Sequence, residues 1–250
     1  MPQDPDIVAF ARMLGEARRI VLFTGAGIST ESGIPDFRSP GGIWTWQTPI
    51  DFADFMRSEA ARRETWRRRF AMDPTLRAAR PNRGHRAVAQ LIADGKASAV
   101  ITQNIDGLHQ GSGIPAAQVI ELHGNTTYAA CLECGQQYEI DALRVDFERD
   151  GIVPHCACGG HVKSATISFG QSMPAAAMRR AEVETLACDL FVSIGSSLVV
   201  YPAAAFPELA RHAGALLAIV NREPTGLDGI ADLVLNRDIG ATFGEAVGVT

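Results

Sequence analysis

The side chains best suited to binding or catalysis lie in the segment VITQNIDGLH, residues 100–109. Val100 and Ile101 read as the end of a short buried strand. Five polar or titratable side chains then follow within eight residues: Thr102, Gln103, Asn104, Asp106 and His109. A polar group that is buried without a partner is costly. The segment is therefore either a solvated turn or a binding site, and its residues alone leave both interpretations open.

A second group of potentially functional side chains consists of two close cysteine pairs, Cys-x2-Cys and Cys-x-Cys, with 21 residues between them. These positions are Cys131, Cys134, Cys156 and Cys158. Four thiolates suit a tetrahedral zinc ion and leave no open coordination position, so the predicted site is structural. Disulfides are the alternative, which a reducing compartment disfavours. Because the second pair is tight, His155 or His161 is an alternative ligand. Cys188 lies in an apolar run and is predicted to belong to the core.

Two glycine-containing segments follow the first apolar run. In TGAGIST (Thr24 to Thr30), glycines after a strand let backbone N–H groups approach a pyrophosphate at the start of a helix. Thr30 occupies the place of the third glycine of a dinucleotide fingerprint, so a merely tight turn is the alternative. In SGIPDFRS, an ordinary loop pinned by Phe37, with Asp36 and Arg38 paired, is the alternative to a binding loop.

The remaining candidates are weaker when taken singly. His123 follows a strand-like run in VIELHGN, but a lone histidine is more often structural than catalytic. The same holds for His85, His109, His155 and His212. The arginine-rich segment RRETWRRRF suggests nucleic acid at first sight. A net charge of −5 favours a solvated helix face instead, with neither nucleic acid nor membrane as a partner.

The elements that must position these residues are apolar runs alternating with helical patterns. The runs RIVLFTGAG, ASAVITQN, ACDLFVSIGSS and ALLAIVNRE are continuous, as in strands buried on both faces of a parallel sheet. Each ends in Gly, Asn or Ser, where an open α/β sheet places its ligand crevice. The spacing of Ile7, Phe10, Ala11 and Leu14 predicts an amphipathic helix that begins near Asp4 to Asp6.

These patterns predict a Rossmann-like, doubly wound α/β fold within one catalytic domain spanning residues 1–250. Its large part comprises about 1–39, 84–125 and 166–250, with a helical insert over about 40–83 and a small zinc-binding module over about 126–165. No apolar run approaches the roughly 20 residues of a membrane span. The first residues lack the pattern of a secretion signal, so we expect a cytoplasmic protein.

Taken together, the segments resemble those of the sirtuins, a family of NAD-dependent protein deacylases. The resemblance runs from about Ile20 to Ile239, and its motifs occur in family order. They are GAGIS, GIPDFRS, PNRGH, TQNIDGLH, ELHG, the four cysteines, FG, GSSL and VN. The resemblance implies a protein lysine deacetylase that moves the acyl group of acetyl-lysine to ADP-ribose. Nicotinamide and O-acetyl-ADP-ribose are released, NAD is the co-substrate, and one structural Zn²⁺ is bound per chain.

The resemblance also implies roles for individual residues. The acetyl oxygen of acetyl-lysine displaces nicotinamide at the ribose C1′, and His123 is the base that activates a ribose hydroxyl in the next step. Asn104 is the second catalytic residue, Gln103, Asn104 and Asp106 line the nicotinamide and ribose pocket, and Phe37 shields C1′. Phosphates lie against residues 25–27 and 195–197, and Asn221 lies at the adenosine ribose.

The implied cofactor-binding set is Gly25, Ala26, Gly27, Thr30, Asp36, Phe37, Arg38, Gln103, Asn104, Ile105, Asp106, His123, Gly195, Ser196, Ser197, Asn221, Arg222, Glu223 and Ile239. The implied substrate-binding set is Ile167, Phe169, Gly170, Leu198 and Val199. The peptide would add as a strand between ISFG and SLVVYP, with its amide N–H on the Ile167 carbonyl.

The sequence departs from the family near this peptide groove. Gln171 replaces the acid that usually follows FG, and Lys163-Ser164-Ala165 replaces the preceding KPD-like stretch, so peptide preference is left open. Desuccinylating members carry Tyr and Arg at the positions matching Arg69 and Met72, which favours neutral acyl groups here. ADP-ribosyl transfer to protein is a further alternative. A non-catalytic NAD or acyl-lysine reader is another, which the joint presence of His123, Asn104 and Asp106 disfavours.

Overall fold

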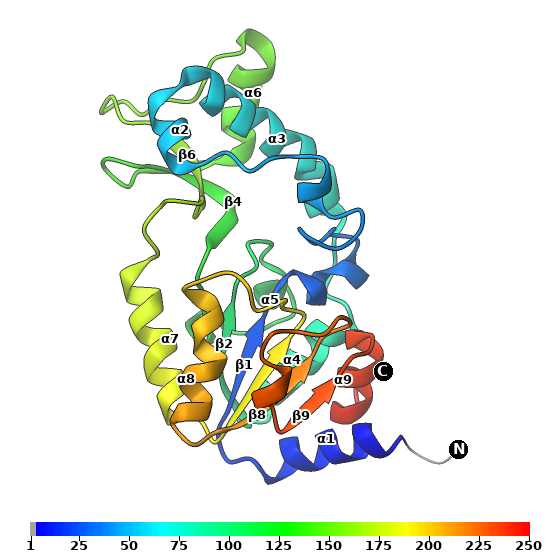
Figure 1. The fold of residues 1–250 in the computed structure, drawn as a ribbon. Helices are drawn as coiled ribbons and strands as arrows, with labels where there is room; N and C mark the ends of the chain where they lie inside the picture. Colours follow the sequence, from blue (N-terminus) through cyan, green and yellow to red (C-terminus); the bar gives the residue numbers. More distant parts are fainter. Residues whose placement is uncertain (1–3) are drawn as a thin grey trace.

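The computed structural model describes residues 4–250. Its large domain is built on a six-stranded sheet in which every pair of neighbouring strands is parallel, so the predicted doubly wound α/β fold is confirmed. The strand order is β3 (Val119–Glu121), β2 (Ala97–Thr102), β1 (Ile20–Thr24), β7 (Leu190–Ile194), β8 (Leu216–Val220) and β9 (Leu233–Leu235). Four of these strands are the predicted apolar runs, and Figure 1 shows them in the lower half of the molecule.

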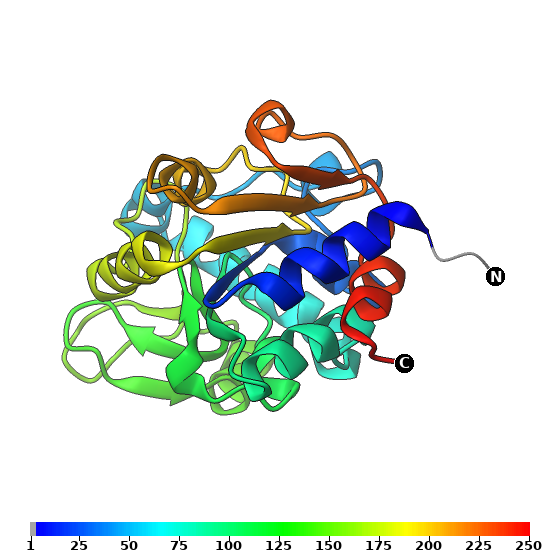
Figure 2. The same ribbon diagram turned by 90° about the horizontal axis from the view of Figure 1, so that it is seen from below.

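Both faces of the sheet are covered by helices, which explains why the strands are continuously apolar. Side chains alternate along β1, so Ile20 and Leu22 face one core while Val21 and Phe23 face the other. The first core is closed by α1 (Pro5–Glu16), α4 (Arg83–Ala93) and α9 (Ile239–Val247), and the second by α7 (Ala175–Ala187) and α8 (Phe206–His212). Figure 2 shows the two helical layers on either side of the strands.

The predicted N-terminal helix is confirmed as α1, which Asp4 caps by accepting a hydrogen bond from the Asp6 N–H at 3.0 Å. The helix expected after the first glycine turn is instead a 3₁₀ helix, η1 (Ala26–Ser32). The other short elements are α5 (Leu108–Gly111), η2 (Ile43–Thr45), η3 (Ala116–Gln118), η4 (Ala203–Ala205) and η5 (Asp228–Ile230). No helix within residues 4–250 is long and apolar enough to cross a membrane.

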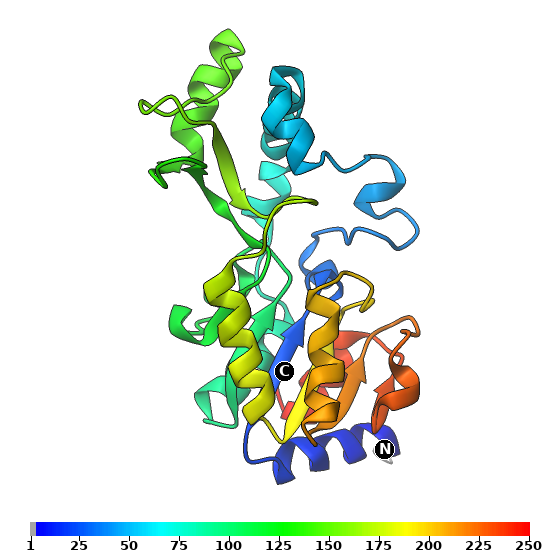
Figure 3. The ribbon, with the colours of Figure 1, turned by 60° about the vertical axis from the view of Figure 1, so that its left-hand side comes forward.

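A small domain lies above the carboxyl ends of the large sheet's strands. It contains an antiparallel sheet ordered β5 (Gln137–Glu139), β4 (Gly124–Cys131) and β6 (Val162–Thr166), with helices α2 (Phe52–Arg57), α3 (Glu59–Ala78) and α6 (Ile140–Asp150). Trp66 and Phe70 of α3 pack in one core with Ala129 and Val162 of this sheet. The two segments predicted as separate inserts therefore fold together, and Figure 3 shows α3 beside α6 and β6.

The solvated arginine face predicted for α3 is only partly correct. Arg62 is buried and donates to the carbonyls of Phe55 and Met56 at 2.9 and 3.0 Å, so it ties α3 to α2. The Arg69 side chain is only 10% exposed and forms an ion pair with Asp73. A guanidinium carries five N–H donors and can therefore serve several buried carbonyls at once. Helical periodicity alone does not reveal such partners.

The four paired cysteines meet at one end of the small sheet. All four sulfur atoms lie within 4.8 Å of one another, and the Cys131–Cys158 and Cys134–Cys156 sulfur distances are both 3.5 Å. A tetrahedron with Zn–S bonds of about 2.3 Å has sulfur–sulfur edges of about 3.8 Å. Disulfide sulfurs would lie about 2.05 Å apart. The four thiols therefore suit a structural zinc ion, and neither neighbouring histidine belongs to the cluster.

The surroundings of this cluster also fit a closed metal site. A Cβ at Gly160 would lie 2.6 Å from the Cys131 sulfur, so only glycine leaves room for the thiolate. Cys131 and Cys156 are part of the same core as Trp66. The fifth cysteine, Cys188, is in the core of the large domain as predicted, where burial raises the pKa of its thiol to about 12.

We expect Cys131→Ser to lower zinc content and thermal stability together, because a hydroxyl is a poor ligand at this position and Cys131 also contributes to the core. Metal analysis and thermal unfolding of the same preparation measure both effects. Cys188→Ala is the matched control and should keep one zinc ion per chain. A metal-free Cys131→Ser protein with parental stability would contradict the assignment.

Candidate active site

The cavity of interest begins at the point where the sheet changes winding direction, between β1 and β7. Strand order on either side of this point matches the classic dinucleotide-binding arrangement, whose ligand crevice lies at the carboxyl ends of the two strands. The Gly27 N–H donates to the Gly195 carbonyl at 2.8 Å. A Cβ at Gly25 or Gly27 would lie within 2.9 Å of the Gly195 backbone. Glycines are thus required for the two turns to meet.

A cavity of about 550 Å³ extends from these turns to the small domain. Every residue of the implied cofactor-binding set lies in its wall, as do Ile167, Phe169 and Gly170 of the implied peptide-binding set. Leu198 and Val199 do not line it, whereas the next residues, 200–202, do. Leu198 is buried and Val199 exposed.

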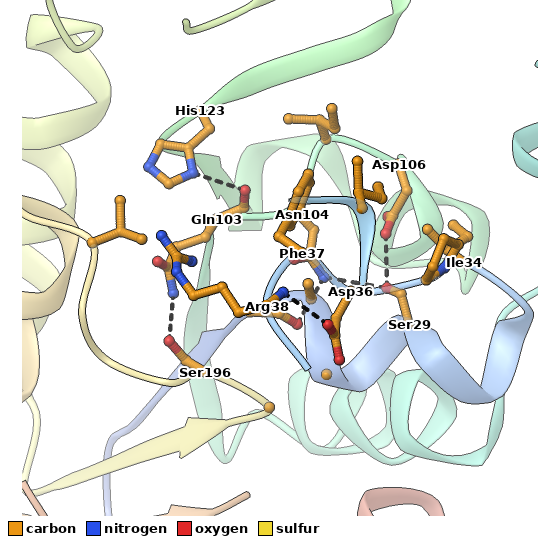
Figure 4. A pocket seen from close by; sticks show the side chains of 18 of the residues that line it. Ser29, Ile34, Asp36, Phe37, Arg38, Gln103, Asn104, Asp106, His123 and Ser196 are labelled. Carbon is orange, nitrogen blue, oxygen red and sulfur yellow. Dashed lines mark hydrogen bonds between the residues drawn. The ribbon is translucent and has the colours of Figure 1, made fainter. Parts of the chain in front are cut away.

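The polar side chains after β2 are largely satisfied by the first glycine turn (Figure 4). Asp106 accepts from the Ser29 hydroxyl at 2.7 Å and from the Leu108 N–H at 2.9 Å. Asn104 donates to the Gly25 carbonyl at 3.0 Å and to Ser29 at 3.2 Å. Burial raises the pKa of Asp106, against the hydrogen bonds that lower it. The segment is therefore a buried, preorganised polar site and not a solvated turn.

His123 lies between β3 and β4, at the junction of the two domains. Its Nδ1 is 2.9 Å from the Gln103 carbonyl oxygen (Figure 4). A carbonyl only accepts hydrogen bonds, so the neutral ring carries its proton on Nδ1 and leaves the Nε2 lone pair free. Burial lowers the pKa of His123 below its usual value, against the raising effect of the Gln103 bond. A neutral imidazole in this position can act as a base near neutral pH.

His109 has a structural role, as expected for a histidine that holds the loop. It is almost fully buried, and its Nε2 is 2.8 Å from the Thr24 hydroxyl at the end of β1. That hydroxyl also donates to Thr102 Oγ1 at 2.8 Å. Burial lowers the pKa of His109 to about 3, so the ring stays neutral. The side chain joins the ends of β1 and β2 beneath the site.

The loop after η1 is held by Asp36, though not through the side-chain pair with Arg38 that the sequence suggested. The Asp36 carboxylate accepts from the backbone N–H groups of Arg38 and Ser39 at 3.0 and 2.9 Å, and from the Ser39 hydroxyl. The Arg38 guanidinium lies over the Trp44 ring, 4.1 Å from its centre. Asp36 thus fixes the turn that presents Phe37 to the cavity.

The departures beside the peptide groove have structural roles. Lys163 is buried in β6, donates to the Thr166 carbonyl at 2.5 Å, and has its pKa lowered by burial to about 8. The Gln171 side chain accepts from the Ser168 N–H at 3.1 Å. Both side chains hold the segment between β6 and α7. The Ile167 N–H in that segment donates to the His123 carbonyl at 2.8 Å. The backbone of Ile167 is therefore fixed beside His123, and its carbonyl is the group that the family resemblance implies for peptide binding.

The cavity wall also contains residues outside the sets implied by the sequence, among them Ser29 and Trp44. Ser29 stands inside the glycine motif, and the need of the partly buried Asp106 carboxylate for a hydrogen-bond donor is the signal that points to it. Trp44 follows a glycine pair in a segment without periodicity, and no sequence signal identified it. At the far end of the cavity, Arg69 donates to Asp73 and to the Thr126 carbonyl, both at 2.8 Å, and Met72 is apolar.

Comparison with known proteins agrees with this architecture. The Sir2 family profile matches residues 25–202. An NAD-dependent protein deacetylase 1 of Bradyrhizobium diazoefficiens is 62% identical, over 94% of this chain and 93% of its own length. An NAD-dependent protein deacetylase of Rhodopseudomonas palustris is 61% identical, over 94% of each chain. A Sir2 structure with a p53 peptide and NAD+ superposes with a TM-score of 0.86 at 38% identity, over 96% of each chain. The chain belongs to the Sir2, or sirtuin, family.

Proposed function

We propose that the protein is an NAD-dependent protein lysine deacetylase that releases nicotinamide and O-acetyl-ADP-ribose. The observation that carries this proposal is the position of His123, whose free Nε2 shares one cavity with the two glycine turns and the buried Asn104–Asp106 segment. The relatives named NAD-dependent protein deacetylase, together with the Sir2 structure containing a peptide and NAD+, support the same activity. A non-catalytic protein that only binds NAD or acyl-lysine would not need a base beside the nucleotide crevice.

NAD would lie along the crevice between the large and small domains. The backbone of residues 25–27 and 195–197 would hold its phosphates, because glycines allow the close approach that pyrophosphate requires. Asn221, Arg222 and Glu223 follow β8 and would face the adenosine ribose. Thr30 donates to the Gly27 carbonyl at 2.9 Å and would hold the turn in shape.

The nicotinamide amide would bind between Asn104, Ile105 and Asp106. An amide requires both a donor and an acceptor, which this segment supplies from its side chains and backbone. Ser29 and Leu108 already hold the Asp106 carboxylate in place, so little conformational entropy remains to be lost on binding. Gln103 donates to Ser196 at 2.9 Å and would tie the ribose end of the pocket to the second glycine turn.

In the first step, the acetyl oxygen of acetyl-lysine would attack the ribose C1′ of NAD and displace nicotinamide. Asn104 would orient the ribose, and Phe37 would shield C1′ from returning nicotinamide. His123 would then accept the proton of a ribose hydroxyl at Nε2. The Gln103 carbonyl keeps the imidazole in the required tautomer and stabilises the imidazolium that forms.

The acetylated peptide would add as an extended strand between residues 167–170 and 198–199. Peptides that bind in this way gain affinity from main-chain hydrogen bonds, with side-chain pockets adding selectivity. The Ile167 carbonyl would accept the acetyl-lysine amide N–H. Phe169 and Gly170 would form the same edge, with Leu198 and Val199 on the opposite side.

Neutral acyl groups are the proposed substrates because the one arginine at the matching specificity positions is already neutralised. Burial alone would raise the pKa of Asp73, but hydrogen bonds from Arg69 and Arg77 lower it below its usual value, so Asp73 is ionised beside Arg69. A succinyl carboxylate would have to compete with this ion pair. Met72 offers it no donor.

The organisation and location of the protein form part of the same proposal. We infer one catalytic domain, with the large part, helical insert and zinc-binding module at the boundaries expected from sequence. A cytoplasmic location agrees with five cysteines that form no disulfide in the described residues.

We expect Asp106→Asn to weaken inhibition by nicotinamide and turnover of NAD by roughly tenfold or more, the range for a lost hydrogen bond to a charged group. Binding of acetyl-peptide should change far less. Nicotinamide inhibition curves and peptide titrations measure the two effects. Asp94→Asn, at an exposed carboxylate on the large domain, should behave like the parent. Parental nicotinamide inhibition in the Asp106 variant would remove this residue from the pocket.

We expect His123→Ala to reduce deacetylation by about 10² to 10⁴-fold, the usual contribution of a general base, equivalent to about 3 to 5 kcal/mol of barrier. NAD and acetyl-peptide should still bind. Exchange of labelled nicotinamide into NAD should fall less, because the acyl oxygen attacks C1′ without a base. Only the neutral ring is active, so the lowered pKa should keep the parental rate high down to a pH below 6.5.

The matched control for this variant is His212→Ala. His212 is exposed on α8, and its Nδ1 likewise lies 2.8 Å from a carbonyl oxygen, that of Glu208. Near-parental deacetylation by His123→Ala would overturn the proposed mechanism. Equal losses of exchange and deacetylation would make His123 a residue that positions NAD.

A further inference from the structure

Three aromatic side chains, Phe37, Trp44 and Phe169, form a continuous row in the wall of the cavity. The Phe37 and Trp44 ring centres are 5.1 Å apart with an interplanar angle of 43°. The Trp44 and Phe169 centres are 5.3 Å apart at 56°. Both pairs have the tilted geometry and spacing that aromatic rings prefer. The row joins the loop after η1 to the segment after β6, which are more than a hundred residues apart in sequence.

Phe37 and Trp44 belong to one closed turn. The Ile43 N–H donates to the Asp36 carbonyl at 2.9 Å, and the Trp44 N–H donates to the Phe37 carbonyl at 3.0 Å. Gly42 makes this possible, since a Cβ there would lie 2.7 Å from the Phe37 carbonyl carbon. The backbones of Phe37 and Trp44 are therefore held together and their rings are in contact, so a shift of this turn displaces both rings.

Phe169 receives a second contact from the same part of the chain. Its carbonyl accepts a hydrogen bond from the Phe52 N–H at 2.8 Å, at the start of α2. Trp44 is only half-buried and Phe169 is 43% exposed, so this pair is not a core contact required for folding. The Arg38 guanidinium also lies over the Trp44 ring and adds a cation–π contact.

We propose that Trp44 is a positioning residue that couples peptide binding to NAD binding. This inference rests on the proposed function, which assigns Phe37 to the ribose C1′ and Phe169 to the peptide edge. A peptide strand that fixes Phe169 would fix Trp44 through their ring contact, and with it the turn that carries Phe37. NAD would then meet a loop that is already ordered.

The coupling must be reciprocal, because each ligand changes the affinity of the other by the same factor. The conformational entropy that this loop loses when the first ligand binds does not have to be lost again when the second ligand binds. Aromatic pairs of this kind contribute enough to change an equilibrium by about two- to tenfold each. Loss of Trp44 should therefore reduce the coupling factor by several-fold or more, while each ligand alone binds nearly as before.

The test compares acetyl-peptide affinity with and without saturating carba-NAD, an analogue whose nicotinamide bond does not break. Calorimetric titration of the parent protein should show tighter peptide binding when carba-NAD is present. For Trp44→Ala the ratio of the two affinities should fall toward one, with unchanged thermal unfolding. Trp44→Phe should restore most of the ratio. Trp46→Ala is the matched control, since Trp46 is 59% exposed and does not line the cavity.

A Trp44→Ala protein that keeps the parental ratio would overturn the inference, as would a ratio of one in the parent. In both cases the proposed function would stand, because both ligands still bind. Failure of the parent to bind either carba-NAD or the acetylated peptide would instead overturn the proposed function. A Trp46→Ala protein with an equally reduced ratio would show that the effect is not specific to the aromatic row.

Discussion

The backbone contact between the turn after β1 and the turn after β7 is the constraint on which the rest of the site depends. Gly27 bonds to Gly195, and neither turn has space for a side chain where they meet. Because the chain leaves these two neighbouring strands toward opposite sides, the contact forms the floor of an open crevice. Asn104 bonds to Gly25 and Asp106 to Ser29, so the polar segment after β2 is fixed to the same floor.

The second requirement is a wall above this floor, which the small domain supplies. The chain enters and leaves the small sheet at adjacent points. Gly124 adopts a left-handed backbone conformation (φ +72°), and a Cβ there would lie 2.0 Å from the Ala165 carbonyl oxygen. His123 therefore lies directly beside the segment that begins with Ile167, and their backbones are hydrogen-bonded. The small-domain core supports the site in two ways: it keeps β4 and β6 together at this junction, and it holds α3, which carries Arg69 and Met72 of the cavity wall.

The sequence predicts the parts of this arrangement that local patterns encode. Continuous apolar runs predicted β1, β2, β7 and β8, and cysteine spacing predicted a four-thiol cluster. Contacts between distant segments were not predictable in this way. The shared core of α3 and the zinc-binding module depends on Trp66 meeting Val162, and the burial of Arg62 depends on carbonyls of another helix. The 3₁₀ helix η1 begins where Gly27 packs against Gly195, and glycine spacing alone does not reveal this contact.

On the proposed function, NAD is cleaved in this crevice only when an acyl-lysine peptide occupies the groove beside it. Release of nicotinamide from NAD, measured with an acetylated peptide, a succinylated peptide and no peptide, tests that claim most directly. We expect rapid release of nicotinamide with the acetyl-lysine peptide, in equal amount to O-acetyl-ADP-ribose, and little release with the succinyl-lysine peptide or without peptide. Nicotinamide release at the same rate in all three reactions, or none with the acetylated peptide, would contradict it.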